Sequence, residues 1–184
     1  MPVASPSPRL TLTPPTRFET LVLPHLDAAY SLARYLMRGA DDARDATQEA
    51  MLKALKHVDQ LRGDDGRPWL LAIVRNTCRT MLGKRVGGDN EISFDEAVHG
   101  TDEAGHPEVE LIRKADQESV HRALEQLPVA YREVIVLREL QDLSYKEIAE
   151  IVQVPIGTVM SRLARGRERL EQLLGAAGAG GGGR

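Results

Sequence analysis

The sequence predicts an all-α protein made of two small helical domains joined by an acidic flexible linker. Apolar residues recur at spacings of three and four in two blocks, residues 18–86 and 116–174. Neither block contains convincing period-two alternation or an Asn-Gly hairpin turn, so no strand is expected. Residues 87–111 between the blocks hold eight acidic residues and no Lys or Arg, a composition typical of a linker.

The first block predicts three helices and one loop. Gly39 is a stop signal after the first apolar stripe, and the carboxylates of Asp41 and Asp42 suit the positive first turn of a new helix. The third apolar stripe starts at Trp69, after a polar segment that carries two glycines. The expected helices cover residues 18–39, 41–58 and 69–85, with the loop at 59–68.

The second block predicts four helices. Pro128 breaks the first apolar stripe and can serve as the first residue of the next helix. Ser144 and Glu147 have the spacing of a capping box, which predicts that a short helix begins there. After a tight turn that contains Pro155, a last helix is expected from about residue 156 to 174.

The two ends of the chain have compositions that favour disorder. Residues 1–16 hold five of the ten prolines and no apolar period, and residues 175–183 are only Gly and Ala. The sequence therefore predicts a flexible leader over 1–16, a domain over 17–86, a linker over 87–115, a second domain over 116–174 and a Gly/Ala-rich tail over 175–184.

Several classes of protein are excluded by composition. No apolar run reaches the roughly 20 residues that cross a bilayer, and the N-terminus lacks a secretory signal, so we expect a cytoplasmic protein with no membrane insertion of its own. The single cysteine forms no internal disulfide. A glycine-rich phosphate loop, an HExxH motif and a nucleophile elbow are all missing, which predicts a binding protein without catalytic residues, cofactor or metal.

The net charge of −3 is a sum of unlike segments. Residues 18–86 carry 11 basic and 9 acidic groups, whereas residues 87–118 carry 2 basic and 10 acidic groups. The negative charge of the linker offsets the positive charge of basic helix faces in the total. The near-neutral net charge therefore does not exclude a nucleic-acid partner.

Residues 144–170 have the layout of a helix-turn-helix, whose second helix lies in the major groove of DNA. Guanidinium groups match phosphates and guanine edges, and hydroxyls near the helix start can bond either. An ordinary solvated face, with the arginines paired to nearby glutamates, is the alternative. The residues expected to face DNA are Thr158, Ser161, Arg162, Arg165, Arg167 and Arg169.

Three stretches of the sequence carry a resemblance to a known family. YKEIAEIVQVPIGTVMSRLARGRERL resembles the C-terminal helix-turn-helix of the extracytoplasmic-function (group IV) sigma factors, and DARDATQEAMLKAL and RPWLLAIVRNTCRTMLGKR are similar to their N-terminal domain. The resemblance implies an alternative sigma factor that directs promoter-specific transcription initiation, in a stress or environmental response. It also implies three partners: core RNA polymerase, through its clamp helices and flap, promoter DNA, and an anti-sigma factor.

The resemblance assigns roles to residues of the first domain. The helix over 41–55 would dock on the polymerase through Asp45, Gln48, Glu49 and Lys53. The helix over 69–85 would hold the melted minus-10 strand through Arg75, Asn76, Arg79, Lys84 and Arg85, and no acidic residue lies between Arg67 and Val86 to oppose it. Asn76 and the loop over 57–67 would form a pocket for a flipped-out base. The last helix would then read the minus-35 element.

Two positions depart from the pattern of the family. Gln153 stands where the turn often has Gly, so a left-handed backbone there would strain the glutamine. Met160 stands where many relatives have Lys or Arg, which alters minus-35 recognition. A stand-alone helix-turn-helix regulator and a helical protein-binding adaptor remain the alternatives at the level of sequence.

Overall fold

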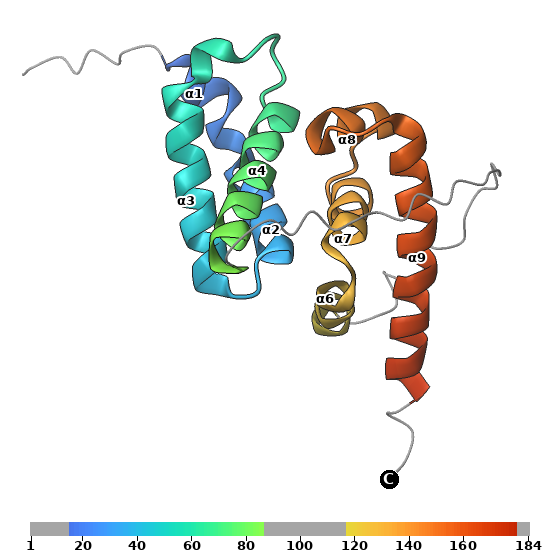
Figure 1. Cartoon of the computed structure of the whole chain (residues 1–184). Helices are drawn as coiled ribbons and strands as arrows, with labels where there is room; N and C mark the ends of the chain where they lie inside the picture. The colour runs from blue at the N-terminus through green and yellow to red at the C-terminus, as the bar shows by residue number, and fades with distance from the viewer. Residues whose placement is uncertain (1–14, 87–116, 180–184) are drawn as a thin grey trace, which may run out of the picture.

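The computed structural model describes residues 15–86 and 117–179, and every regular element in these two ranges is a helix (Figure 1). The predicted all-α fold is confirmed. The predicted linker, residues 1–14 of the leader and residues 180–184 of the tail lie outside the described residues.

The first domain contains α1 (Arg17–Leu21), α2 (Leu26–Leu36), α3 (Ala40–Lys56) and α4 (Arg67–Val86), and α2, α3 and α4 pack against one another. The buried face of α3 consists largely of small side chains, which allow the helices to approach closely: Ala43, Ala46, Ala50 and Ala54. The prediction of one helix over 18–39 was wrong. Pro24 lies in a 3-10 turn, Leu23–His25, that separates α1 from α2, because proline has no N–H to donate within a longer helix.

Helix α1 fixes the loop that leads into α4. Thr16 caps α1 in a capping box with Glu19, so this residue belongs to the folded domain and not to the leader. Arg17 Nη2 donates to the carbonyl oxygens of Leu61 and Gly63 at 2.7 and 3.2 Å. These bonds tie the start of the domain to the loop between α3 and α4.

The second domain contains α6 (Gln117–Gln126), α7 (Val129–Ile135), α8 (Tyr145–Val152) and α9 (Ile156–Ala179). The capping box of Ser144 and Glu147 at the start of α8 is confirmed. Pro128 is the N-cap of α7, and not its first residue as predicted. A π-helical segment, Val136–Leu140, continues α7 and was not predicted, since a widened turn leaves no mark on the apolar period.

Helix α9 is longer than predicted. Residues 175–179 continue the helix, so the prediction of a disordered tail was wrong for these five residues. Alanine is the best helix former, and adding residues to an existing helix costs far less than nucleating one.

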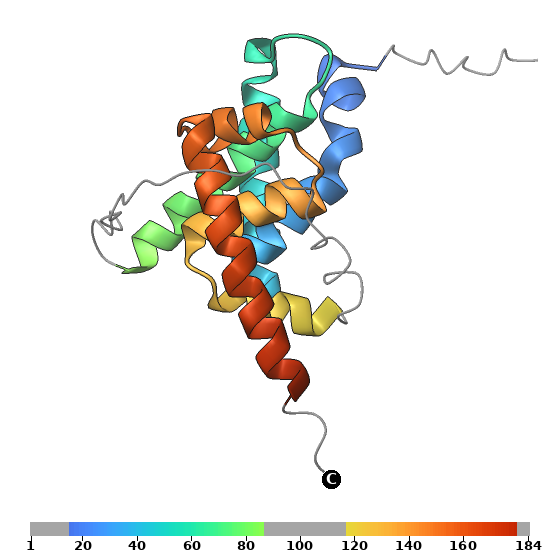
Figure 2. The same ribbon diagram turned by 90° about the vertical axis from the view of Figure 1, so that its right-hand side faces the viewer.

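The two domains pack side by side (Figures 1 and 2). Helix α4 contacts α8, and α2 contacts α6, α7 and the π-helical segment. Within the described residues, no helix combines the length and the hydropathy that a membrane span requires.

Candidate nucleic-acid interface

The turn between α8 and α9 has the geometry that a helix-turn-helix requires. Gln153 adopts the left-handed conformation, with φ 57° and ψ 46°, so the strain foreseen for this position is present. The Val154 amide donates to the Ala149 carbonyl at 3.2 Å, which closes the end of α8. The Pro155 carbonyl accepts from the amides of the first turn of α9. Backbone bonds therefore satisfy the Ala149 carbonyl at the end of α8 and the Thr158 and Val159 amides at the start of α9.

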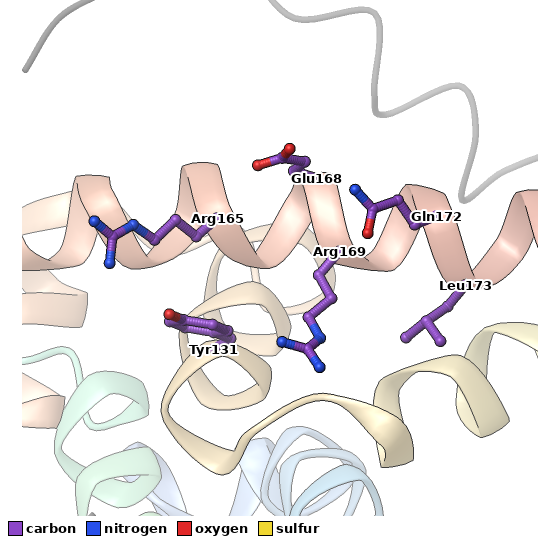
Figure 3. Close-up of a pocket in the computed structure, with 6 residues that line it drawn as sticks. All are labelled: Tyr131, Arg165, Glu168, Arg169, Gln172 and Leu173. Atoms are coloured by element: carbon purple, nitrogen blue, oxygen red, sulfur yellow. The ribbon is translucent and has the colours of Figure 1, made fainter. Parts of the chain in front are cut away.

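Part of the predicted DNA-facing set is exposed on α9. Ser161, Arg165 and Arg169 are exposed and Thr158 is half-buried. Arg165 and Arg169 border a cavity of ≈ 480 Å³ with Tyr131 of α7. In Figure 3, Arg169 points toward the side of α9 on which Tyr131 lies, and Glu168 points to the opposite side. The exposed residues of α9 thus offer cations and a hydroxyl to an anionic partner.

The prediction that four arginines share the outward face of α9 was wrong for Arg162 and Arg167. Arg167 donates through Nε and Nη2 to Glu139 Oε1 at 3.1 and 2.5 Å, and its side chain is 16% exposed. Arg162 is 13% exposed, with Nη1 3.9 Å from Glu133 Oε1. Both side chains lie beside carboxylates of the preceding segments, Glu133 for Arg162 and Glu139 for Arg167, and are therefore only slightly exposed.

Burial has an electrostatic effect on Arg162. Desolvation lowers the pKa of its guanidinium from the ordinary value, and the positive charges of Arg75 and Arg79 act in the same direction. The carboxylate of Glu133 opposes this shift. Arg162 therefore lies in a site where Glu133 partly compensates a local excess of positive charge.

Arg75 of α4 was expected on an exposed phosphate track, and this expectation was also wrong. Its side chain is 5% exposed, and it binds Glu133 of α7 through Nε to Oε2 at 2.9 Å and Nη2 to Oε1 at 3.1 Å. Nη2 also donates to the Val152 carbonyl at 3.4 Å. Sequence reasoning missed this contact because Glu133 lies 58 residues away in the other domain.

The other predicted minus-10 residues lie differently. Asn76, Arg79 and Lys84 are exposed on α4. The backbone of Arg85 is helical, and its side chain lies outside the described part of the chain. The Asn76 side-chain oxygen accepts from Arg75 Nη1 at 3.2 Å. The amide nitrogen of Asn76 remains a donor for a ligand.

A cavity of ≈ 350 Å³ lies between the end of α3, the following 3-10 turn and α4. It brings Asn76 together with His57 and Gln60, two residues of the turn and loop that follow α3. Lys53 Nζ donates to Thr77 Oγ1 at 3.2 Å on one wall. Residues that sequence reasoning did not assign to this cavity also line it: Lys53, Trp69, Ile73, Thr77 and Thr80. The cavity thus combines a half-buried indole with amide, hydroxyl and imidazole groups, which suits a planar polar ligand such as a base.

The predicted polymerase face of α3 is largely exposed. Asp45, Gln48 and Glu49 are exposed, and half-buried Lys53 binds Glu49 at 2.7 Å. The bond from Lys53 lowers the pKa of Glu49, with a further contribution from the charge of Lys84. Leu52 and Leu55, exposed to 61% and 53%, were missed as candidates. The signal was available, because these leucines fall outside the alanine stripe that packs α3 on its neighbours.

Cys78 lacks the features of a reactive site. Burial raises the pKa of the Cys78 thiol to about 12, so this cysteine is an inert core residue. Among the residues that the structure describes, no group of three or more His, Cys, Asp or Glu could hold a metal ion.

Comparison with known proteins bears on both domains. The Sigma-70 region 2 family matches residues 21–86, and the Sigma-70 region 4 family matches residues 117–170. The chain is 33% identical over 165 residues to the RNA polymerase sigma-H factor of Pseudomonas aeruginosa, covering 85% of this chain and 86% of that relative. It is 36% identical over 163 residues to the ECF RNA polymerase sigma-E factor of Escherichia coli, covering 84% of each.

Two solved structures share the fold. The sigma factor RpoE of Bartonella quintana, in complex with the anti-sigma factor NepR, matches with a TM-score of 0.66 and 30% identity. The match covers 84% of this chain and 94% of that one. CnrH, solved with the cytosolic domain of CnrY, is similar in fold, with a TM-score of 0.52 and 24% identity.

Proposed function

The chain belongs to the sigma-70 family, as an RNA polymerase sigma factor of the extracytoplasmic-function type, and on this premise we propose that it is a group IV factor that captures a melted base in the α3–α4 cavity. The observation that carries the proposal is the meeting of Asn76 with His57 and Gln60 around one cavity. Enzymes that act on bases bind a flipped base through its edge and by stacking, and the same contacts serve capture without chemistry.

In this proposal the cavity binds a base of the minus-10 strand, and the basic residues of α4 bind its phosphates. The Asn76 amide and the polar residues of the cavity offer donors and acceptors to a base edge, and the Trp69 indole offers a stacking surface. Exposed Arg79 and Lys84 offer cations to the phosphates. Arg75 can contact a phosphate only after its ion pair with Glu133 breaks.

The minus-35 element is proposed to bind the exposed residues of α9. In a helix-turn-helix the N-terminal residues of the second helix reach base edges, which suits Thr158 and Ser161. Arg165 offers a bidentate donor to guanine or phosphate, and Arg169 lies one turn further on. Arg167, held by Glu139, instead fixes α9 on the preceding segment.

Core RNA polymerase is the proposed partner of α3. Asp45, Gln48 and Glu49 present carboxylates and an amide, and exposed Leu52 and Leu55 add apolar area beside them. Charged rims around an apolar centre are common in protein interfaces. In the resembling family this surface meets the clamp helices, and the second domain meets the flap.

Control by an anti-sigma factor is proposed from a relative. The RpoE factor of Bartonella quintana was solved with its anti-sigma factor NepR. We infer the same class of partner here, acting in the cytoplasm, where transcription takes place, on a factor for a stress or environmental response.

Transcription in vitro tests the proposal. Purified chain and core polymerase are incubated with promoters identified by sequencing the RNA 5′ ends that overexpression induces. Asn76→Ala is expected to lower initiation about 10- to 100-fold while binding to the minus-35 duplex stays unchanged, because one base contact contributes about 1–3 kcal/mol. Arg122→Ala, exposed on α6, is the matched control. If wild-type protein binds duplex DNA but directs no initiation, the proposed function is wrong.

A further inference from the structure

Glu133 binds an arginine from each domain. Its side chain is 2% exposed; it holds Arg75 of α4 through two bonds of 2.9 and 3.1 Å and lies 3.9 Å from Arg162 of α9. Both arginines belong to helices to which we assign DNA contacts. We propose that Glu133 holds free protein in a closed, promoter-incompetent state by binding Arg75 of the first domain in place of DNA phosphate, with Arg162 of its own domain as a second cation beside the same carboxylate. The proposal rests on the proposed function, and we call Arg75, Glu133 and Arg162 the Glu133 cluster.

The chemistry of the Glu133 cluster resembles that of phosphate recognition. A carboxylate and a phosphate both accept two parallel hydrogen bonds from one guanidinium group. A carboxylate that binds both of these N–H donors therefore excludes the phosphate. Arg75 makes this two-bond contact with both oxygens of Glu133. A charge pair this deeply buried is weakly screened by salt.

Other contacts also link the two domains. Arg67 Nη2 of α4 donates to the backbone and side-chain oxygens of Gln141 at 2.6 and 3.1 Å. Arg34 of α2 lies 2.9 Å from His121 of α6. Both contacts link the first domain to the second, and neither bond is made to a carboxylate. The Glu133 cluster adds a buried ion pair to these contacts.

The closed state does not fit a promoter. Elements named minus-10 and minus-35 lie ~25 base pairs apart, which is ~85 Å along B-DNA at ~3.4 Å per pair. In the closed state Arg75 and Arg162 both lie within 4 Å of one carboxylate group. The two domains must separate before they can reach both elements, and the first consequence of separation is the release of Arg75 from Glu133. Opening and promoter binding are therefore coupled through one residue.

A distance measurement in the full-length free protein tests this coupling. Donor and acceptor dyes are placed on Arg44→Cys in α3 and Glu171→Cys in α9, two exposed positions on opposite domains. Cys78 is buried, and burial raises the pKa of its thiol to about 12, so it does not compete for the dyes. Single-molecule energy transfer then reports the fraction of open molecules without polymerase or DNA.

Three variants distinguish the Glu133 cluster from other effects of charge. Glu133→Gln and Arg75→Gln are both expected to raise the ratio of open to closed molecules about tenfold. Arg75→Gln changes no residue of the second domain. It therefore still tests the inference if Glu133→Gln unfolds that domain. Lys56→Gln removes one positive charge from an exposed position at the end of α3, to which no DNA or polymerase contact is assigned, and is expected to keep the closed fraction of wild type. Circular dichroism checks that each variant retains its helices.

The outcomes separate this inference from the proposed function. If Arg75→Gln keeps the energy-transfer distribution of wild type, the inference is wrong, even when wild-type protein directs transcription with core polymerase. An equal shift in Lys56→Gln would also overturn it, because the loss of any positive charge would then have the same effect. A shift confined to the Glu133 and Arg75 variants supports it, including in the case where no transcription is observed and the proposed function fails.

Discussion

Replacement of Gln153 by glycine is expected to stabilise the protein. Gln153 lies in the left-handed region, where a residue with a side chain pays about 1–2 kcal/mol relative to the right-handed conformation. Glycine adopts this conformation freely, but the greater freedom of the unfolded glycine chain costs about 0.4–1 kcal/mol. The Gln153 side chain is exposed, so its removal loses little packing. The net gain is about 0.5–1 kcal/mol.

Thermal unfolding of the full-length chain, followed by far-UV circular dichroism, measures this gain. For a protein of this size, 1 kcal/mol moves Tm by about 2–4 °C, so Gln153→Gly should raise Tm by about 1–4 °C. Glu150→Gly is the matched control, because position 150 is exposed within α8 and helical. It should lose about 1 kcal/mol and lower Tm. If Gln153→Gly lowers Tm as much as the control, the reasoning from backbone strain is refuted.

Three other changes have expected outcomes. Gly66→Ala should lose about 1–3 kcal/mol in urea unfolding, because an added Cβ would lie 2.0 Å from the Leu21 carbonyl oxygen. Acidification should weaken folding, because burial, assisted by Arg34, lowers the pKa of His121 from the ordinary 6.5. The unfolded chain therefore binds the proton first as the pH falls, and stability declines from pH 6.5 down to the folded pKa. Met160, 47% exposed on α9, should contact a thymine methyl. Replacing that thymine by deoxyuridine should then weaken duplex binding by about 0.8 kcal/mol, or about fourfold.

Each of these outcomes has a control. Gly83→Ala is the control for the glycine substitution, because Gly83 is helical and an added Cβ meets no atom within 4 Å; it should gain about 1 kcal/mol. His121→Gln should flatten the pH dependence, and an unchanged profile would assign the dependence to other groups. Met160→Ala should bind thymine and deoxyuridine duplexes equally. A persistent preference for thymine in this variant would exclude Met160 as the methyl contact.

The helices and the helix-turn-helix could be predicted from the sequence because the signals for them are local. The apolar period predicted the position of α4, the Ser144 and Glu147 pair predicted the start of α8, and the departure at Gln153 indicated where strain would lie. In each case the interacting groups lie within a few residues of one another, and short-range sterics and capping bonds determine the conformation. The break at Pro24 was available from the same rules and was overlooked.

The exposure of the charged residues could not be predicted in this way. Arg75, Arg162 and Arg167 occur in basic patterns that are typical of a DNA-binding face, and the structure turns all three toward carboxylates. The sequence by itself determined which helices form and which of them carry cations. Only the tertiary structure decided which cations face the solvent, because that depends on which surfaces of two domains meet, and Glu133 reaches Arg75 across 58 residues of chain.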